Sequence, residues 1–359
     1  MLYPTCLTKR GRATAKAIQN MNDIDLSLIQ SIKRYSAGTS DILYFIDSYQ
    51  RKGVKTIRLA ETTAPPHEPI LLCAVKDDLE RVKAQIEYHK KIGVQHFAYI
   101  DNMSTDGTYE WLRQQNDVSL FVVEEAYSAA KRTAWRKQVM DILGYDRWYL
   151  VLDSDEFFCY PAIEHVPITH YVEYLESKGL GSAHAPLIDM YSKEALFSTS
   201  EKEDKDRSFF DAYCYFDTDT YLSYALYRKR GVQGGPRARL FPASIISISK
   251  YPLVKARAAT ISSCHRNYPL QEQKWATAFL LHYKFLPSDV HKCMDIIRSG
   301  NYYLGSHNYK QYMEAYEQNP NLTFYYEGSQ KFNSSMDLLK INLCDRQFFK
   351  DFFTAYKEV

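Results

Sequence analysis

Cysteine is scarce in this sequence, and its distribution argues against two classes of protein. The 359 residues contain seven cysteines, an odd number, and no CxxC pair occurs among them. Isolated thiols are typical of a reducing compartment and not of a disulfide framework, and no zinc-type cluster can be drawn from them. We therefore expect a cytoplasmic protein. The cysteines are Cys6, Cys73, Cys159, Cys214, Cys264, Cys293 and Cys344.

Long apolar runs are also absent. No segment approaches the run of about 18 apolar residues that marks a membrane-spanning helix. The N-terminus has no uninterrupted apolar stretch, so we expect no signal peptide. Scattered basic residues in this region are typical of a solvated helix face, but they leave open a peripheral association with the inner face of the cell membrane. They are Lys9, Arg10, Arg12, Lys16, Lys33 and Arg34.

An excess of either charge is missing as well. Lys and Arg total 45 and Asp and Glu total 43, which gives a formal net charge of +2. A polyanion-binding protein carries a basic excess, so we expect no nucleic-acid partner. Hydrophobic residues at 45% and charged residues at 25% are ordinary globular values that argue against wholesale disorder. Tyrosine is abundant, with 30 copies, and it suits both protein cores and sugar recognition.

Strand and helix patterns alternate between residues 70 and 152. Short apolar runs at 70–75, 94–100, 118–123 and 148–152 predict buried strands. Apolar residues recur at helical spacing between them, and Gly93 and Gly144 act as stop signals after the two longer helices, 79–92 and 128–143. This alternation predicts an α/β fold with a mostly parallel sheet flanked by helices.

The two flanks of this region have other patterns. Residues 1–68 have the pattern of a helical extension that ends in a breaker cluster with two prolines. After residue 160 the alternation loosens: we expect a strand within 181–191, a loop at 201–224 and a Gly-rich turn at 231–241. The end of the chain is helical and rich in tyrosine. We therefore expect an N-terminal extension (1–68), a central domain (69–290) and a C-terminal tail (291–359).

Acidic residues follow the ends of two predicted strands. Asp101 ends the second strand, and Asp153-Ser154-Asp155 directly follows the fourth. In parallel sheets ligands bind beyond the carboxyl ends of the strands. Paired carboxylates at such a place suit Mg²⁺ or Mn²⁺, usually completed by substrate phosphates. The alternative is a solvated acidic turn or a helix cap, and the cap role is favoured for Asp106.

With these motifs, the sequence resembles the nucleotide-diphospho-sugar glycosyltransferases of the GT-A fold. Within them it is similar to the glycosyltransferase family 2 branch found in bacterial surface-polysaccharide loci. The resemblance extends over residues 70–290. It is carried by Ala74-Val75-Lys76, Asp101-Asn102-x-Ser104-x-Asp106-Gly107-Thr108, Asp153-Ser154-Asp155-Glu156-Phe157, Leu187-Ile188-Asp189-Met190-Tyr191, Gly234-Gly235-Pro236-Arg237-x-Arg239-Leu240-Phe241, Ser263-Cys264-His265 and Leu281-His282-Tyr283-Lys284-Phe285-Leu286.

The resemblance implies a GT-A (Rossmann-like) fold and a donor site. Val75, Lys76 and Asp101 would line the nucleoside pocket. Lys131 or Arg132, on the helix before the fourth strand, would approach the base or the diphosphate.

The resemblance also implies a metal site for Mn²⁺ or Mg²⁺. Asp153 would face the ribose and the metal, and Asp155 would bind the metal. His282 would be a late metal or diphosphate ligand. The usual acid-rich motif of the catalytic base is not obvious, and Asp189 is the best match for that role.

Several basic and aromatic residues keep two interpretations. Arg237, Arg239 and Lys284 are candidate clamps for the diphosphate or the acceptor, because cationic side chains match phosphate, or they form surface ion pairs. His265 is either a hydrogen-bonded core residue or a functional one. Three of the four tryptophans are expected in the core rather than as sugar platforms; they are Trp135, Trp148 and Trp275.

The function that the sequence predicts is a metal-dependent glycosyltransferase of the hexosyltransferase type, with an inverting reaction. Its donor would be a UDP-sugar, and its acceptor a hydroxyl of a saccharide or glycolipid in surface-polysaccharide or lipopolysaccharide synthesis. Two alternatives remain, a non-catalytic carbohydrate-binding protein and a sugar-phosphate nucleotidyltransferase. The latter would open with a Gly-rich loop, where this chain has Ala74-Val75-Lys76. A haloacid-dehalogenase phosphatase fits poorly, because it needs DxDxT on its first strand.

Overall fold

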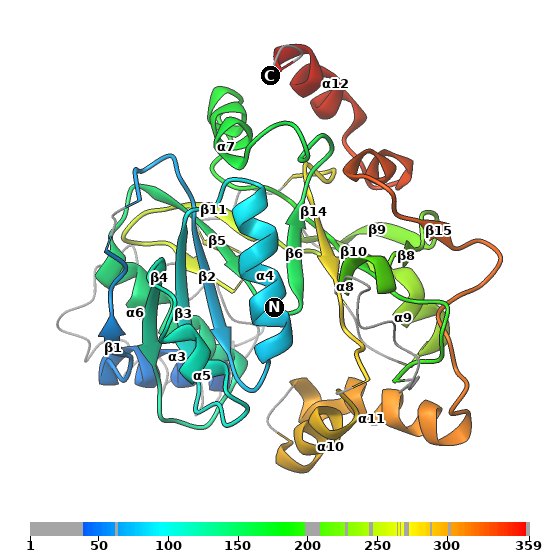
Figure 1. Ribbon diagram of the computed structural model, residues 1–359, viewed down its shortest axis with the longest axis horizontal. Helices are drawn as coiled ribbons and strands as arrows, with labels where there is room; N and C mark the ends of the chain where they lie inside the picture. The colour runs from blue at the N-terminus through cyan, green and yellow to red at the C-terminus, as the bar shows by residue number, and fades with distance from the viewer. Residues whose placement is uncertain are drawn as a thin grey trace, which may run out of the picture.

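The structure is a computed structural model, and it describes most of the chain (Figure 1). The described residues are 39–61, 64–197, 209–226, 229–243, 247–263, 265, 267–268, 273–287, 289–300 and 303–356. Residues 1–38 of the expected N-terminal extension, Cys6, Cys264 and part of the expected loop at 201–224 lie outside them.

A six-stranded sheet forms the first half of the molecule, in the order β1-β4-β3-β2-β5-β11. The four central strands are parallel, and an antiparallel strand closes each edge. The strands are β1 (Lys55–Arg58), β2 (Ile70–Val75), β3 (His96–Asp101), β4 (Val118–Val122), β5 (Arg147–Leu152) and β11 (Leu253–Ala256). This architecture confirms the expected α/β fold class, with a mostly parallel sheet flanked by helices.

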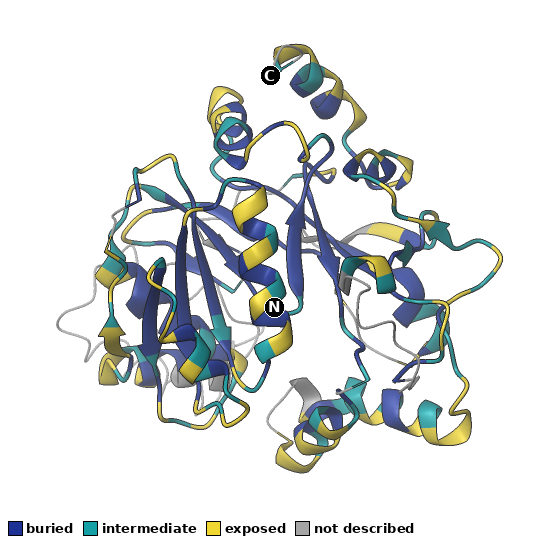
Figure 2. Cartoon of the chain, in the orientation of Figure 1, coloured by how far each residue is buried: buried dark blue, intermediate teal, exposed yellow. Residues whose placement is uncertain are grey.

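Alternate residues of the parallel strands enter different cores, which explains their continuous apolar runs. Leu71 and Cys73 pack on the face covered by α4 (Leu79–Lys91), together with Val82 and Ile86 of that helix. Ile70 and Leu72 pack on the other face, with Trp135 and Val139 of α6 (Ala129–Leu143). Figure 2 shows the resulting buried strands between helices with exposed outer faces.

A second, three-stranded sheet continues from the first. After β5 the chain makes a short acidic turn and enters β6 (Glu156–Cys159), which pairs with β14 (Phe279–His282), and β14 pairs with β7 (Leu187–Asp189). Smaller pairs complete the strands: β8 (Tyr215–Phe216) with β15 (Gln330–Lys331), β9 (Tyr221–Leu226) with β10 (Lys229–Gly234), and β12 (Ile261–Ser262) with β13 (Asn267–Tyr268).

The last helix docks onto the main core through aromatic rings. Phe348 and Phe352 pack against Tyr171 and Tyr174, which joins the C-terminal end to the central region (Figure 1). The remaining helices are α3 (Thr39–Arg51), α5 (Thr108–Leu112), α7 (Ile168–Ser177), α8 (Phe209–Ala212), α9 (Gly235–Leu240), α10 (Asp289–Ser299), α11 (Tyr303–Gln318), the 3₁₀ helix η1 (Ser335–Lys340) and α12 (Arg346–Ala355).

Three local expectations were wrong. Residues 231–241 form the end of β10 followed by α9, not a turn; Gly234 has φ +117° and lies against the Thr220 carbonyl, where a Cβ would clash. The described part of the expected loop at 201–224 contains α8, β8 and most of β9. Trp275 is 37% exposed rather than in the core, and Lys274 lies over its ring.

Candidate functional site

Gln85 of α4 binds the backbone of the acidic turn between β5 and β6. The Gln85 amide nitrogen donates to the carbonyl of Asp153 at 2.8 Å and to that of Glu156 at 2.9 Å. Tyr99 of β3 donates to the Gln85 amide oxygen at 2.7 Å. Gln85 of α4, held in place by Tyr99 of β3, therefore fixes the backbone of the turn between β5 and β6.

Three cationic side chains surround the carboxylate of Asp153. Arg132 and Arg136 donate to Oδ1 at 2.7 Å and 2.8 Å, and Lys250 donates to Oδ2 at 3.3 Å. Both arginines come from one face of α6 because they are four residues apart. Burial alone would raise the pKa of Asp153, but the cations, Arg132 first, hold it well below its usual value. The carboxylate is therefore ionised and sits in a positive surrounding.

The carboxylate of Asp155 faces a histidine and a lysine from the end of β14. Its Oδ2 lies 3.3 Å from His282 Nε2 and 3.1 Å from Lys284 Nζ. Burial would raise its pKa, but Lys284 and then His282 hold it well below the usual range. In the same way, burial would lower the pKa of Lys284, and Asp155 reverses that effect and raises it.

His282 joins Asp155 to the buried carboxylate of Asp189. His282 Nδ1 lies 2.6 Å from Asp189 Oδ1, and Arg237 Nε donates to Asp189 Oδ2 at 2.8 Å. Burial raises the pKa of Asp189, but Arg237 and His282 together lower it below its ordinary value. The structure therefore brings together five of the residues predicted from the sequence: Asp155, Asp189, Arg237, His282 and Lys284.

The donor set suits a divalent metal held partly by a substrate. Among the described residues, no group of three or more His, Cys, Asp or Glu side chains converges as a complete metal cage. Asp155 and His282 supply one oxygen and one nitrogen 3.3 Å apart. Mg²⁺ commonly uses only one or two carboxylates of the protein and completes its shell with substrate phosphates and water. Both oxygens of Asp153, by contrast, have cationic partners.

Asp101 lies at the carboxyl end of β3 and is almost fully buried. Its Oδ2 accepts from the Ser104 backbone at 3.1 Å, while Oδ1 has no hydrogen-bond partner within the described part of the chain. Burial raises the pKa of Asp101, and the bonds from Ser104 offset this only in part. The backbones of Met103 and Asp77 beside it have positive φ, a strain that occurs often at ligand sites.

The other predicted nucleoside residues have ordinary surroundings. Val75 is buried, and its carbonyl accepts from Asn102 at 2.9 Å. Lys76 is exposed. Asp106 is not the N-cap residue of a helix, since the N-cap positions of α5 and α4 are Gly107 and Asp78. Its carboxylate nevertheless accepts from the backbone of Thr108 and of Leu79, the first residues of these two helices.

Two predicted basic residues, Lys131 and Arg239, have partners away from the acidic turn. Lys131 donates to the carbonyl of Ala126 and pairs with Glu125 at 3.2 Å. Arg239 contacts Asp217 and lies over the ring of Tyr326 at 4.1 Å. His265 is nearer to the turn: its Nδ1 lies 3.1 Å from the carbonyl of Ser249, the residue before Lys250, which pairs with Asp153.

Comparisons with known proteins give a distant structural match. No family model and no curated protein matches the chain. Among solved structures, the chain is similar to a mannosyltransferase from Pyrobaculum calidifontis in complex with GDP-Man and Mn²⁺, with 13% sequence identity and a TM-score of 0.23. The match covers 49% of this chain and 47% of that one, so it spans about half the length of either protein. Separately, no helix among the described residues is long and apolar enough to cross a membrane.

Sequence reasoning missed several residues that build this site. Arg136 is four residues after Arg132, and this spacing on one helix face could have revealed it. Lys250 pairs with Glu156 at 2.6 Å and with Asp153, but it comes from a loop before β11 with no motif. Gln85 and Arg81 lie on the buried face of α4. No local pattern distinguishes them from ordinary helix residues.

Proposed function

We propose that this chain is a metal-dependent glycosyltransferase that moves a sugar from a nucleoside-diphosphate donor to a hydroxyl acceptor. The observation that supports the proposal best is the surrounding of Asp155. An ionised carboxylate faces His282 and Lys284 at 3.3 Å and 3.1 Å, directly after the carboxyl end of a parallel strand. That is the edge of an α/β sheet at which ligands bind.

Different residues of the site would bind different parts of a sugar nucleotide. Asp101, whose buried Oδ1 has no hydrogen-bond partner among the described residues, would accept from the base or the ribose. Val75 and Lys76 would border that pocket. Asp155 and His282 would hold the divalent metal, Mn²⁺ or Mg²⁺, with Asp153 beside them. When bound, the metal would neutralise charge on the leaving diphosphate.

Cationic side chains support the departure of the diphosphate. Lys284 and Arg132 pair with the two carboxylates of the acidic turn and are within reach of a phosphate bound to the same turn. Fixed positive charge near the bridging oxygen stabilises the transition state as negative charge develops there. Lys131, Arg237 and Arg239 were also predicted as donor or acceptor contacts; the partners described above make them less direct candidates.

The donor and acceptor classes follow from the sequence resemblance. We propose a UDP-sugar as the donor and a saccharide or glycolipid hydroxyl as the acceptor, in the synthesis of a surface polysaccharide, with inversion at the sugar carbon. The site would work in the cytoplasm, and peripheral contact with the inner membrane face is compatible with a lipid-linked acceptor.

Isothermal titration calorimetry with UDP tests the proposal, and GDP serves as the comparison nucleotide. We expect UDP to bind the wild-type protein in the presence of Mn²⁺ and to bind at least tenfold more weakly without it or to Asp155→Ala. Asp295→Ala is the matched control, because that carboxylate is 71% exposed and pairs only with Arg298 in the described structure. If GDP binds more tightly than UDP, the proposed donor becomes a GDP-sugar and the proposed transferase activity stands. Equal UDP affinity in wild type and Asp155→Ala would contradict the metal role of Asp155, and binding of neither nucleotide would contradict the proposed function.

A further inference from the structure

We infer that Asp189 is a positioning residue that aims the imidazole of His282 at the metal site, and not the general base that the sequence resemblance implies. The inference rests on the proposed function, because it assigns a role within the same metal site. It follows from the strand register, the tautomer that the contacts require and the burial of Asp189.

The second sheet places His282 beside Asp189, and the turn before that sheet brings Asp155 to the other side of the ring. In the parallel pair β14–β7, His282 is in register with Asp189. In the antiparallel pair β14–β6, His282 is in register with Glu156, the residue after Asp155. The Tyr283 backbone also donates to the Asp155 carbonyl at 2.9 Å. Residues in register on neighbouring strands project to the same face, so the sheet itself places the side chains of His282 and Asp189 together. Asp155 reaches His282 Nε2 from the turn that precedes β6.

The contacts of the ring assign its tautomer. His282 Nδ1 lies 2.6 Å from Asp189 Oδ1, so it carries the proton in that hydrogen bond. In the neutral ring Nε2 then presents a lone pair, 3.3 Å from Asp155 Oδ2. Either a second proton on the ring or a metal cation can join these two atoms, and the metal would take the place of that proton when it binds. Metal-binding histidines typically donate their other N–H to a carboxylate in this way, which fixes the tautomer and the ring orientation.

Asp189 is poorly suited to act as a base. Its side chain is only 3% exposed, and each oxygen already has a partner, His282 on Oδ1 and Arg237 on Oδ2. Arg237 is itself buried, on α9, and its ion pair keeps Asp189 ionised. A base must reach the acceptor hydroxyl within hydrogen-bond distance, and the burial of Asp189 between His282 and Arg237 argues against such an approach.

Two variants of Asp189 separate positioning from proton transfer. Asn can still accept from Nδ1–H, so Asp189→Asn should retain the ring orientation. Asp189→Leu combined with Arg237→Met removes the acceptor and also the arginine that would otherwise be left unpaired. The matched control is Asp217→Asn, a fully buried carboxylate that bonds Tyr191 at 2.5 Å and contacts Arg239 but does not touch His282.

The readout is the affinity for Mn²⁺ in the presence of UDP, measured by electron paramagnetic resonance of the free ion. We expect Asp189→Asn and Asp217→Asn to bind Mn²⁺ within about threefold of wild type, and the double variant to lose about 10–100-fold, the usual effect of removing such a partner. Nitrogen-15 NMR of labelled histidine, without metal, should show the Nδ1–H tautomer in wild type and Asp189→Asn, and a mixture in the double variant.

The possible failures are distinguishable. If the double variant binds Mn²⁺ like wild type, or if the wild-type ring carries its proton on Nε2, the positioning role is overturned while the proposed function stands. If Asp189→Asn binds Mn²⁺ normally but loses hydrolysis of UDP-glucose, Asp189 is the base instead. If wild type binds UDP but no Mn²⁺, the metal role proposed for the whole site fails and this inference fails with it.

Discussion

Lys250 Nζ lies 2.6 Å from Glu156 Oε1, and both side chains are only 2% exposed. The same ammonium group also donates to Asp153 at 3.3 Å, and Glu156 Oε2 accepts from the Asp153 backbone at 3.1 Å. A single buried lysine thus connects the loop before β11 to both the side chain and the backbone of the acidic turn. This arrangement ties the stability of the fold to the geometry of the proposed donor site.

Replacing Lys250 should destabilise the protein strongly. Lys250→Met leaves Glu156 buried without its cation, a change that typically costs about 3–5 kcal/mol. Urea unfolding at neutral pH measures the loss. The control is Lys255→Met, because Lys255 pairs with Glu176 at 2.8 Å on the surface and such pairs contribute about 1 kcal/mol or less. The Lys250→Met/Glu156→Gln double variant should recover part of the loss; a double variant no more stable than the single one would contradict this account.

Arg132 should contribute directly to nucleotide affinity. It pairs with Asp153 at 2.7 Å and its side chain is 15% exposed, so it can exchange part of that contact for a phosphate. Charge-assisted bonds contribute about 1.5–3 kcal/mol, so Arg132→Met should weaken UDP binding by about 10–100-fold in calorimetry with Mn²⁺.

The control for Arg132 is Arg298→Met, on a side chain that is 71% exposed. It should leave UDP affinity unchanged. An unaltered dissociation constant in Arg132→Met would show that this arginine serves only to hold Asp153.

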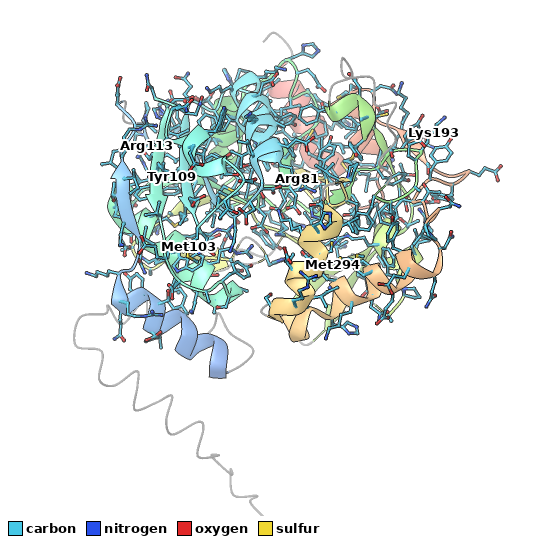
Figure 3. All side chains as sticks on the ribbon, turned by 60° about the horizontal axis from the view of Figure 1, so that its bottom comes forward. Arg81, Met103, Tyr109, Arg113, Lys193 and Met294 are labelled. Atoms are coloured by element: carbon cyan, nitrogen blue, oxygen red, sulfur yellow. The ribbon has the colours of Figure 1, made fainter. Side chains whose placement is uncertain are left out.

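Arg81 should anchor α10 to the sheet region. Its guanidinium, near the centre of the molecule in Figure 3, donates to Asp78 at 2.9 Å, to Asp289 and to the Tyr283 carbonyl at 3.0 Å. Arg81→Met leaves two buried carboxylates without their main partner and should cost about 3–5 kcal/mol. Hydrogen exchange should rise most in residues 283–299. Uniform exchange across the chain would argue against a local anchor, and Arg113→Met on the surface serves as control.

Buried neutral histidines should make the protein sensitive to acid. Burial lowers the pKa of His184 to about 4 and that of His89 to about 3. At pH values between these lowered pKa values and the ordinary value near 6.5, the two imidazoles bind protons in the unfolded chain but not in the native state. Stability therefore falls as pH decreases from about 6.5 toward 4, by at most about 1.4 kcal/mol per pH unit for each imidazole.

Urea unfolding at pH 7, 6 and 5 measures this dependence. His184→Phe keeps a ring stacked on Tyr251 but cannot titrate, so its stability should fall less steeply with pH than that of wild type. The same slope in both proteins would show that His184 is not responsible.

The sequence by itself determined the order and type of the central elements. The strands at β2, β3, β4 and β5 and the helices α4 and α6 were predicted because apolar periodicity and glycine stops are local signals. The same signals placed Asp101, Asp153 and Asp155 at strand ends, where a parallel sheet gathers its ligands. Local patterns failed at 231–241, where three glycines indicated a turn and the chain forms the end of β10 and α9 instead.

Only the tertiary structure decided which charges meet. His282 contacts a residue 93 positions away and another 127 positions away, through the pairing of β14 with β7 and β6. Lys250 reaches Asp153 across 97 positions. Strand pairing over such separations depends on how the whole chain packs. A pattern of buried residues predicts that a segment is a strand, but it does not predict which other strand pairs with it. The residue types were therefore visible in the sequence, while their partners and the consequent role of Asp189 depend on the fold.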